Sequence, residues 1–288
     1  MTIRILLFTM LPILCVAQVS PKEDILSNNN PSIERENLST KRNAQYNLEE
    51  IKVRWKKAAL ENCSGVPCVT FTCGTSTVSD FDGNAYNTVA IGAQCWTKEN
   101  LKVTKYNDGT LIGDSTNSTW GTAGAALIGA RTENLGMFVP SSGYVGTYGY
   151  LYNWYAATDP RKLCPTGWHV PTDIEWTNLI QFIDPNANAG GIVAANQSNT
   201  AGSKLKSTGT TLWGPPNTDA DNSTNFSALP SGQRIGSSGS GIRNIARFWS
   251  TSVDAGAVWV RMMTQNNGEV EVNKNSFSAG LAVRCLKD

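Results

Sequence analysis

The sequence predicts an exported protein that contains β-structure, is rich in loops and is stabilised by disulfides. A short hydrophobic N-terminus precedes six further cysteines, an even number that in an exported chain most simply forms disulfides. Charged residues make up only 16% of the chain, whereas Gly, Asn, Ser and Thr are plentiful, which is typical of a loop-rich fold containing β-structure. One strong helix signal lies between segments of alternating apolar residues, which adds the helical component.

Residues 1–17 are predicted to be a secretory signal peptide. Arg4 precedes an apolar run from Ile5 to Val16, and Ala17 ends a small-residue cleavage site. The run is too short to span a bilayer. Cys15 raises lipoprotein processing as an alternative, but Leu14 stands where that signal requires a small residue. We therefore expect the protein to be extracellular or on the cell surface, in the outer envelope.

The charge balance excludes two classes of partner. Cleavage after residue 17 of 288 leaves 271 residues and removes Arg4, so 23 basic residues face 23 acidic ones. Nucleic acids and anionic membrane surfaces both require a basic excess, which is missing here. No second apolar stretch approaches about twenty residues, so no membrane span is predicted.

The exported chain divides into three parts. Residues 18–47 are polar and predict a disordered lead-in. Residues 48–62 predict a helix, because Ile51, Trp55 and Ala58 share one face. Residues 63–288 are expected to form a single domain.

Strands and turns dominate the first part of that domain. Asp82-Gly83-Asn84 predicts a turn between apolar-alternating segments, and Asn107-Asp108-Gly109 predicts a second turn. Residues 112–147 are rich in Gly, Thr, Ser and Ala and predict a long irregular loop, a kind of segment that often carries function.

The clearest helix starts at Thr172. Thr172 as N-cap and Glu175 three residues later form a capping box, which gives partners to two backbone donors. Four apolar residues then predict an inward stripe, and Pro185 ends the helix; the stripe is Trp176, Leu179, Ile180 and Ile183.

A loop-rich stretch continues to about Ala246, and the last forty residues predict antiparallel strands. Phe248–Ser252 is the first strand, and a second alternates through Val258, Val260 and Met262. Asn267-Gly268 predicts a type I′ hairpin turn before the next strand.

Several blocks of residues form an ordered pattern over roughly 75–288. They are Asp82-Gly83-Asn84 with Val89-x-Ile91-Gly92-x-Gln94-x-Trp96, Tyr148-Gly149-x-Leu151-Tyr152-Asn153-Trp154, Leu163-Cys164-Pro165-x-Gly167-Trp168-His169-Val170-Pro171-Thr172, Phe226-x-Ala228-Leu229-Pro230-x-Gly232-x-Arg234, Phe248-Trp249-Ser250-Thr251-Ser252 and Val283-Arg284-Cys285. This pattern resembles the Fibrobacter succinogenes major paralogous domain family. The resemblance implies a compact α+β domain of the C-type lectin-like fold, which formylglycine-generating enzymes share. Such a domain has a twisted antiparallel sheet, flanking helices and long irregular loops. The family brings no established general activity.

The same resemblance implies the cysteine pairing. Lectin-like folds join the first helix region to the last strand by a cystine, which here implies Cys164–Cys285. Cys73–Cys95 would then brace the first hairpin and Cys63–Cys68 would close a small loop, although these four residues also permit other pairings. A Cys₄ metal site from the same four is the alternative, but their spacing lacks the usual CxxC knuckles.

No catalytic residue is predicted, so we do not expect an enzyme. His169 is the only histidine and lies between Trp168 and Val170, where a structural role is more common than catalysis. Motifs such as GxSxG and HExxH, and phosphate-binding loops, are missing. A formylglycine-generating activity would need a reactive cysteine pair near the C-terminus, where only Cys285 lies.

Two sets of residues are candidate binding sites. Four oxygen-bearing residues in a predicted loop suit Ca²⁺, although no cofactor is required: Asn217, Asp219, Asp221 and Asn225. The EPN, QPD and WND signatures of calcium-dependent lectins are missing. Three aromatic residues lie where we expect exposed loops and could stack on sugars: Trp120, Tyr144 and Trp213. Trp154, Trp168, Trp176 and Trp249 are expected in the core.

These observations favour a non-catalytic binding module for polysaccharide or for a surface protein. Loops 112–147 and 190–245 would form its recognition face. An enzyme related to formylglycine-generating enzymes and a structural envelope component are the alternatives.

Overall fold

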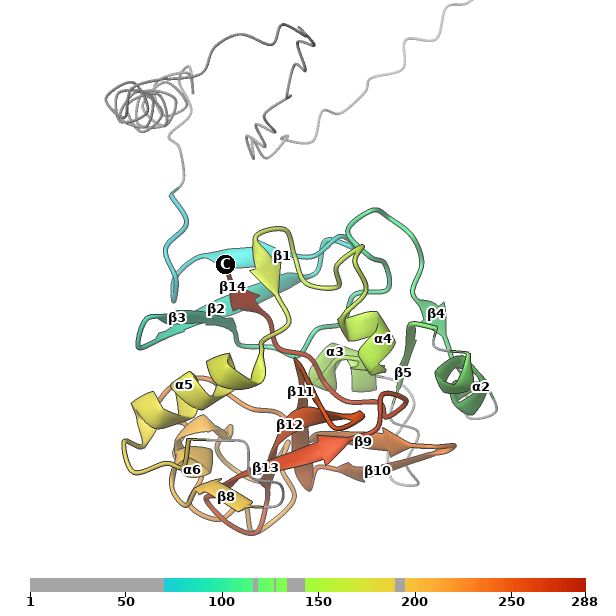
Figure 1. Ribbon diagram of the computed structural model, residues 1–288. Coiled ribbons are helices and arrows are strands. Elements are labelled where there is room, and N and C mark those ends of the chain that lie inside the picture. The colour runs from blue at the N-terminus through green and yellow to red at the C-terminus, as the bar shows by residue number, and fades with distance from the viewer. Residues whose placement is uncertain (1–69, 116–118, 127, 134–142, 190–194) are drawn as a thin grey trace, which may run out of the picture. The chain divides into compact units, whose positions relative to one another are not determined.

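The computed structural model describes residues 70–288 apart from 116–118, 127, 134–142 and 190–194 (Figure 1). The described residues from Phe71 onward form one compact unit. The predicted signal peptide, polar lead-in and N-terminal helix, together with Cys63 and Cys68, lie outside the described residues. Within the described part of the chain, no helix has both the length and the apolar character needed to cross a bilayer.

The first sheet joins both ends of the unit. Its order is β1-β2-β3-β14-β7, and all pairs are antiparallel: β1 (Thr77–Ser79), β2 (Ala85–Ile91), β3 (Gln94–Thr97), β14 (Leu286–Lys287) and β7 (Trp168–His169). The predicted turn at Gly83, whose φ is 83°, connects β1 to β2. The last strand therefore lies between strands formed early and midway along the chain.

The second sheet is antiparallel and has the order β11-β12-β13-β8. It contains β11 (Ile245–Asp254), β12 (Ala257–Thr264), β13 (Val270–Asn275) and β8 (Ala195–Ser198). The strands predicted for the last forty residues are thus confirmed.

The type I′ turn predicted at Asn267-Gly268 is wrong. That turn requires positive φ at both central residues, and neither Asn267 nor Gly268 has one. Gly268 meets a different constraint: a Cβ there would collide with the hydroxyl of Ser203, and one on Gly202 would collide with the carbonyl of Glu269. Glycine is needed because helix α6 (Ala201–Leu205) packs directly on the turn.

The expected irregular loop over 112–147 contains several short elements instead. They are β4 (Gly113–Asp114), α2 (Trp120–Ala125), β5 (Ala130–Thr132) and α3 (Tyr144–Tyr148). β5 pairs with β4 and with β6 (Leu151–Tyr152), and α4 (Trp154–Ala157) follows. The later loop-rich stretch likewise contains a hairpin of β9 (Ser231–Ile235) and β10 (Ser238–Ile242). Tertiary contacts stabilise these elements, which are too short for local patterns to predict.

Helix α5 (Asp173–Ile183) forms as the sequence predicts. Thr172 accepts from the backbone nitrogen of Glu175, and the Glu175 carboxylate accepts from the backbone nitrogen of Thr172 at 2.7 Å. The four stripe residues Trp176, Leu179, Ile180 and Ile183 are all buried. In Figure 1, α5 lies beside β11 and β12, which it contacts.

The segment 280–286 connects most of these elements. Gly280 exchanges two backbone hydrogen bonds with Arg234, and Leu281 exchanges two with Tyr152. Ala282 bonds to both Arg247 and Trp249, and Val283 and Cys285 accept from Leu101 and Thr97. One extended segment thus hydrogen-bonds to β9, β6, β11, the end of β3 and the chain after β3.

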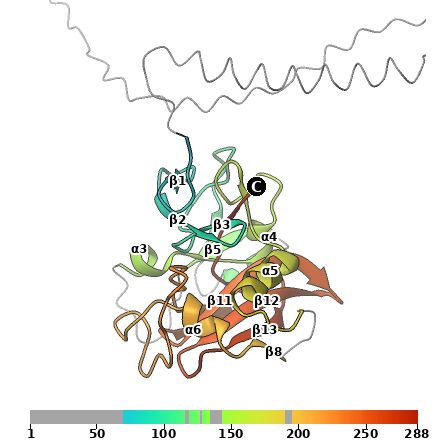
Figure 2. The same ribbon diagram turned by 90° about the vertical axis from the view of Figure 1, so that its left-hand side faces the viewer.

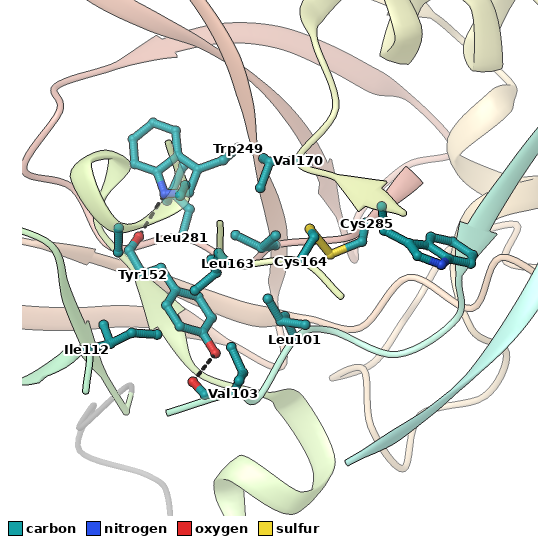
Figure 3. Packing of buried hydrophobic residues seen from close by; sticks show 14 of the residues in the cluster. Leu101, Val103, Ile112, Tyr152, Leu163, Cys164, Val170, Trp249, Leu281 and Cys285 are labelled. Atoms are coloured by element: carbon teal, nitrogen blue, oxygen red, sulfur yellow. Dashed lines mark hydrogen bonds between the residues drawn. A yellow bond between two sulfur atoms is a disulfide. The ribbon is translucent and has the colours of Figure 1, made fainter. Parts of the chain in front are cut away.

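The apolar core has two large clusters. One surrounds Tyr152, whose hydroxyl donates to the carbonyl of Val103 and whose own carbonyl accepts from Trp249 Nε1 (Figure 3). The other contains a group of edge-on and stacked aromatic rings: Trp96, Trp176, Phe226 and Phe248. Trp168, Trp176 and Trp249 are buried as predicted, while Trp154 is only half-buried.

Two predicted disulfides are confirmed. Cys164 joins Cys285 across a separation of 121 residues, in the first core cluster (Figure 3). Cys73 joins Cys95 across 22 residues and fixes the segment before β1 to β3. A Cys₄ metal site that includes Cys73 and Cys95 is therefore excluded.

Replacing each disulfide by two alanines should destabilise the protein to different extents. The chain-entropy model gives about 5 kcal/mol for Cys164–Cys285 and about 3 kcal/mol for Cys73–Cys95, because the first closes the longer loop. Urea unfolding of both double variants measures this. Equal decreases in the free energy of unfolding would contradict the expectation that Cys164–Cys285 contributes more.

Replacing Glu175 by alanine should lower the free energy of unfolding by about 1 kcal/mol at pH 7, because the capping box is lost. Burial raises the pKa of Glu175, but hydrogen bonds from Thr172 and the contact with His169 outweigh it and hold the pKa below the usual 4.5. The carboxylate thus stabilises the fold above pH 4.5, and this contribution is lost as the pH falls through the folded-state pKa.

The stability difference between wild type and Glu175→Ala should therefore narrow at acidic pH in urea titrations. Asn178→Ala is the control, because Asn178 is an exposed, uncharged residue of the same helix. A difference for Glu175→Ala that does not change with pH would refute the assignment.

Candidate functional site

A groove with a volume of about 620 Å³ lies between β2 and the end of α5. In Figure 2, the side of the molecule that carries β2 and α5 faces the viewer. One wall is the edge of β2 from Thr88 to Gly92, a second is Phe182 of α5, and a third is the loop 223–225. The volume is in the range of small-molecule sites.

Phe182 provides an exposed aromatic surface in this groove. Its side chain is 63% exposed, although it belongs to a helix whose opposite face is fully buried. The ring rests on Gly92, where a Cβ would lie 2.8–3.1 Å from ring atoms and where φ is +60°. A residue with a side chain at position 92 would displace the ring, so the glycine positions this surface.

Three polar side chains that line the same groove as Phe182 are not used within the described fold. Lys98 makes no ion pair with any described residue, and the Ser223 hydroxyl and the Asn225 amide form no hydrogen bond within the described chain. Asn225 is exposed and has a φ of 58°, the left-handed conformation that asparagine tolerates. By contrast, Thr88 and Thr224 use their hydroxyls within the fold.

Two buried cations hold the loop that forms the third wall. Arg284 is fully buried, and its guanidinium donates to the carbonyls of Phe226 and Ser227 at 2.9 and 2.8 Å. It also donates to Thr97 O and to Asn100 Oδ1, so it joins the loop to the chain after β3. Burial lowers the pKa of Arg284 to about 9, although the charge of Glu99 acts in the opposite direction.

Lys206 is the second buried cation. Its ammonium donates to the carbonyls of Thr218, Thr264 and Asn267 at 2.7–3.0 Å, and it lies over the ring of Trp213. Burial lowers the pKa of Lys206 to about 8, while the nearby charge of Asp219 opposes the shift. Lys206 thus bridges the loop after α6 and the turn between β12 and β13.

The four predicted calcium ligands play different parts in this loop. Asn217 is buried, and its amide nitrogen donates to Ser207 O and Gly209 O. Asp219, Asp221 and Asn225 are exposed, and Asp221 accepts from the backbone of Ser223. Among the residues described, no group of three or more His, Cys, Asp or Glu could hold a metal ion. A second cation beside Asp219 would meet the charge of Lys206.

The expectation that Trp120, Tyr144 and Trp213 are exposed is wrong. Their exposed fractions are 1%, 3% and 0%. Trp120 and Trp213 donate their indole nitrogens to the carbonyls of Ser278 and Ala228, and Tyr144 donates its hydroxyl to Ser231 O. These rings anchor the loops from within, which composition alone cannot distinguish from ligand contact.

Trp120 also forms part of a smaller groove of about 320 Å³. Tyr155 and Phe277 line it together with Ser276 and Ser278, whose hydroxyls lie 3.3 Å apart. It contains an aromatic pair but no charged residue among those described as lining it. We take the larger groove as the candidate site because three of its polar side chains, those of Lys98, Ser223 and Asn225, form no ion pair or hydrogen bond within the described chain.

The single histidine has a structural environment. His169 Nε2 lies 3.0 Å from Glu175 and Nδ1 lies 2.6 Å from Asp288. The imidazole thus connects the start of α5 to the residue after β14, and no described serine or cysteine side chain forms a hydrogen bond with it. All four described cysteines are in disulfides.

A family model, the Fibrobacter succinogenes major domain, matches residues 89–287. The chain belongs to this family. The Fibrobacter succinogenes major domain here begins inside β2 and ends inside β14, so it contains both buried cations and the Cys164–Cys285 bond. Of the groove residues, only Gly74 and Thr88 precede it. Neither the comparison with curated proteins nor that with solved structures found a match.

Sequence reasoning identified Asn225, although as a metal ligand, but not Phe182, Lys98 or Ser223. Of these three residues, only Phe182 carries a signal in the sequence that could have predicted its exposure. It is an aromatic residue on the outer face of a helix whose inner stripe is complete without it. Its position beside Gly92, 90 residues earlier, is decided only by the fold.

Replacing Lys206 by methionine should lower the free energy of unfolding by about 2–3 kcal/mol, because three buried carbonyl oxygens lose their donor. Lys204→Met is the matched control, since Lys204 is half-buried and donates to the single carbonyl of Ile183. Lys204→Met should lower the free energy of unfolding by about a third as much.

Calcium and EDTA should leave the melting temperature of the wild type unchanged. An increase in the melting temperature with calcium would instead support the predicted metal site.

Proposed function

We propose that this protein is an exported, non-catalytic module that binds polysaccharide in the groove between β2 and α5. The observation that carries the proposal is the exposed ring of Phe182 in the same groove as an amide, a hydroxyl and an ammonium that have no side-chain partners within the described chain. An aromatic face suits the C–H side of a sugar ring, and the polar groups suit its hydroxyls.

Export and a C-type lectin-like fold are part of the same proposal. Two disulfides support an oxidising compartment, in keeping with the predicted signal peptide. Antiparallel sheets, a flanking helix α5 and a closing Cys164–Cys285 bond support the lectin-like assignment. The groove requires no calcium in this proposal, because Lys206 and Arg284 hold its loop wall.

The absence of catalysis is also a proposal. An enzyme of the formylglycine-generating type needs a free thiol, and the described cysteines offer none. Thiol titration of the oxidised protein tests this alternative, since a reactive free thiol would revive it. A structural envelope component, the other alternative, would not need a ligand in the groove.

A surface protein is the second candidate ligand. β1 pairs with β2 only as far as Asn87, so the outer edge of Thr88–Ile91 carries no neighbouring strand in the described chain. Asn87 O accepts from Lys98 N on the β3 side, so the backbone groups of Ala90, three residues on, face the opposite edge. An extended peptide could add a strand there.

Phe182→Ala should weaken polysaccharide binding about tenfold, through loss of the aromatic surface. The oxidised protein is first tested on a glycan array, in calcium and in EDTA, and the strongest glycan is then measured by calorimetry. Ile174→Ala is the matched control, because Ile174 is 68% exposed on the same helix and does not line the groove. An unchanged affinity for the glycan in Phe182→Ala would contradict the assignment of the groove as the binding site.

A further inference from the structure

The groove contains one charged side chain, and this charge indicates which class of sugar the groove would bind. Lys98 is the only ionisable residue among the described groove-lining residues. It is half-buried and makes no ion pair with the described chain. A cation in a groove without acids leaves a positive site for a ligand to neutralise.

Two carboxylates that adjoin groove-lining residues in the sequence accept hydrogen bonds within the described chain. Glu99 accepts from the backbone and the amide of Asn87, both at 2.8 Å. Asp221, beside the loop wall, accepts from the backbone of Ser223 at 2.8 Å. The cation of Lys98 therefore remains available, and it does so in a chain whose overall charge is close to neutral.

We propose that the groove selects anionic polysaccharides, with Lys98 binding a carboxylate or sulfate on a sugar that rests on Phe182. This inference rests on the proposed function and specifies its substrate class. Charge-assisted hydrogen bonds are about twice as strong as neutral ones, which makes Lys98 the residue that determines specificity. Phe182, the Ser223 hydroxyl and the Asn225 amide would contact neutral and anionic chains equally.

The test measures binding of the disulfide-bonded protein at 150 mM salt to two matched pairs of polymers. Polygalacturonate is compared with its fully methyl-esterified form, and dextran sulfate with dextran, so that the carboxylate and sulfate sources are separated. We expect at least one anionic polymer to bind about tenfold more tightly than its neutral partner, as for one charge-assisted contact.

In Lys98→Gln, the anionic polymer and its neutral partner should bind with about equal affinity. Lys98→Arg should retain the preference for the anionic polymer. Lys102→Gln is the control, because Lys102 is equally half-buried and nearby but does not line the groove. Phe182→Ala should weaken the neutral and anionic polymers alike. Equal affinity for charged and neutral partners, or equal losses for Lys98→Gln and Lys102→Gln, would overturn the selectivity while leaving polysaccharide binding intact.

Two outcomes separate the inference from the function it rests on. Binding of neither polymer pair would remove the proposed function itself. Binding of poly-L-glutamate as tightly as polygalacturonate, with the same loss in Lys98→Gln, would show that the groove recognises charge on a peptide and would overturn the saccharide class.

Discussion

The buried guanidinium of Arg284 is the constraint on which the rest of the structure depends. Its hydrogen bonds go to the carbonyls of Thr97, Phe226 and Ser227 and to the amide oxygen of Asn100, and it lies over the rings of Phe226 and Phe248. A buried cation is tolerated only where such partners are already in place. The surrounding segments must therefore adopt one arrangement, and the neighbouring Cys285 is fixed in it by the disulfide to Cys164.

Buried cations perform in this domain a task that metal ions perform in many loop-rich folds. Lys206 binds three carbonyl oxygens, Arg284 binds three more, and Arg261 connects Asp173 of α5 to Gln197 of β8. Removal of such a charge leaves several oxygens unsatisfied at once, so each cation ties together segments that carry little secondary structure of their own. This explains how a loop such as 217–227 can keep a defined position without helix or strand.

The groove is a product of the same network. Its loop wall is held from below by Lys206 and Arg284, whereas its helix wall is placed by the capping box and the inward stripe of α5. The walls are thus held by buried groups, while Lys98, Ser223 and Asn225 line the groove without forming a side-chain ion pair or hydrogen bond in the described chain. A rigid wall with uncommitted polar groups lowers the entropic cost of holding a ligand.

The sequence by itself determined the local features of this protein. Capping chemistry defined α5 through Thr172 and Glu175, alternation defined β11 to β13, and glycine with asparagine marked the turn before β2. Family resemblance supplied the Cys164–Cys285 pairing and the α+β class. These are properties of neighbouring residues or of ordered blocks, so they are readable along the chain.

Only the tertiary structure decided which side chains face solvent and which meet across the fold. Trp120, Tyr144 and Trp213 lie in polar, glycine-rich stretches yet are buried, whereas Phe182 belongs to the best-predicted helix yet is exposed. Lys98 and Phe182 are 84 residues apart and share one groove. Burial and long-range proximity depend on how segments pack around Arg284 and the central segment 280–286, and no local pattern encodes that packing.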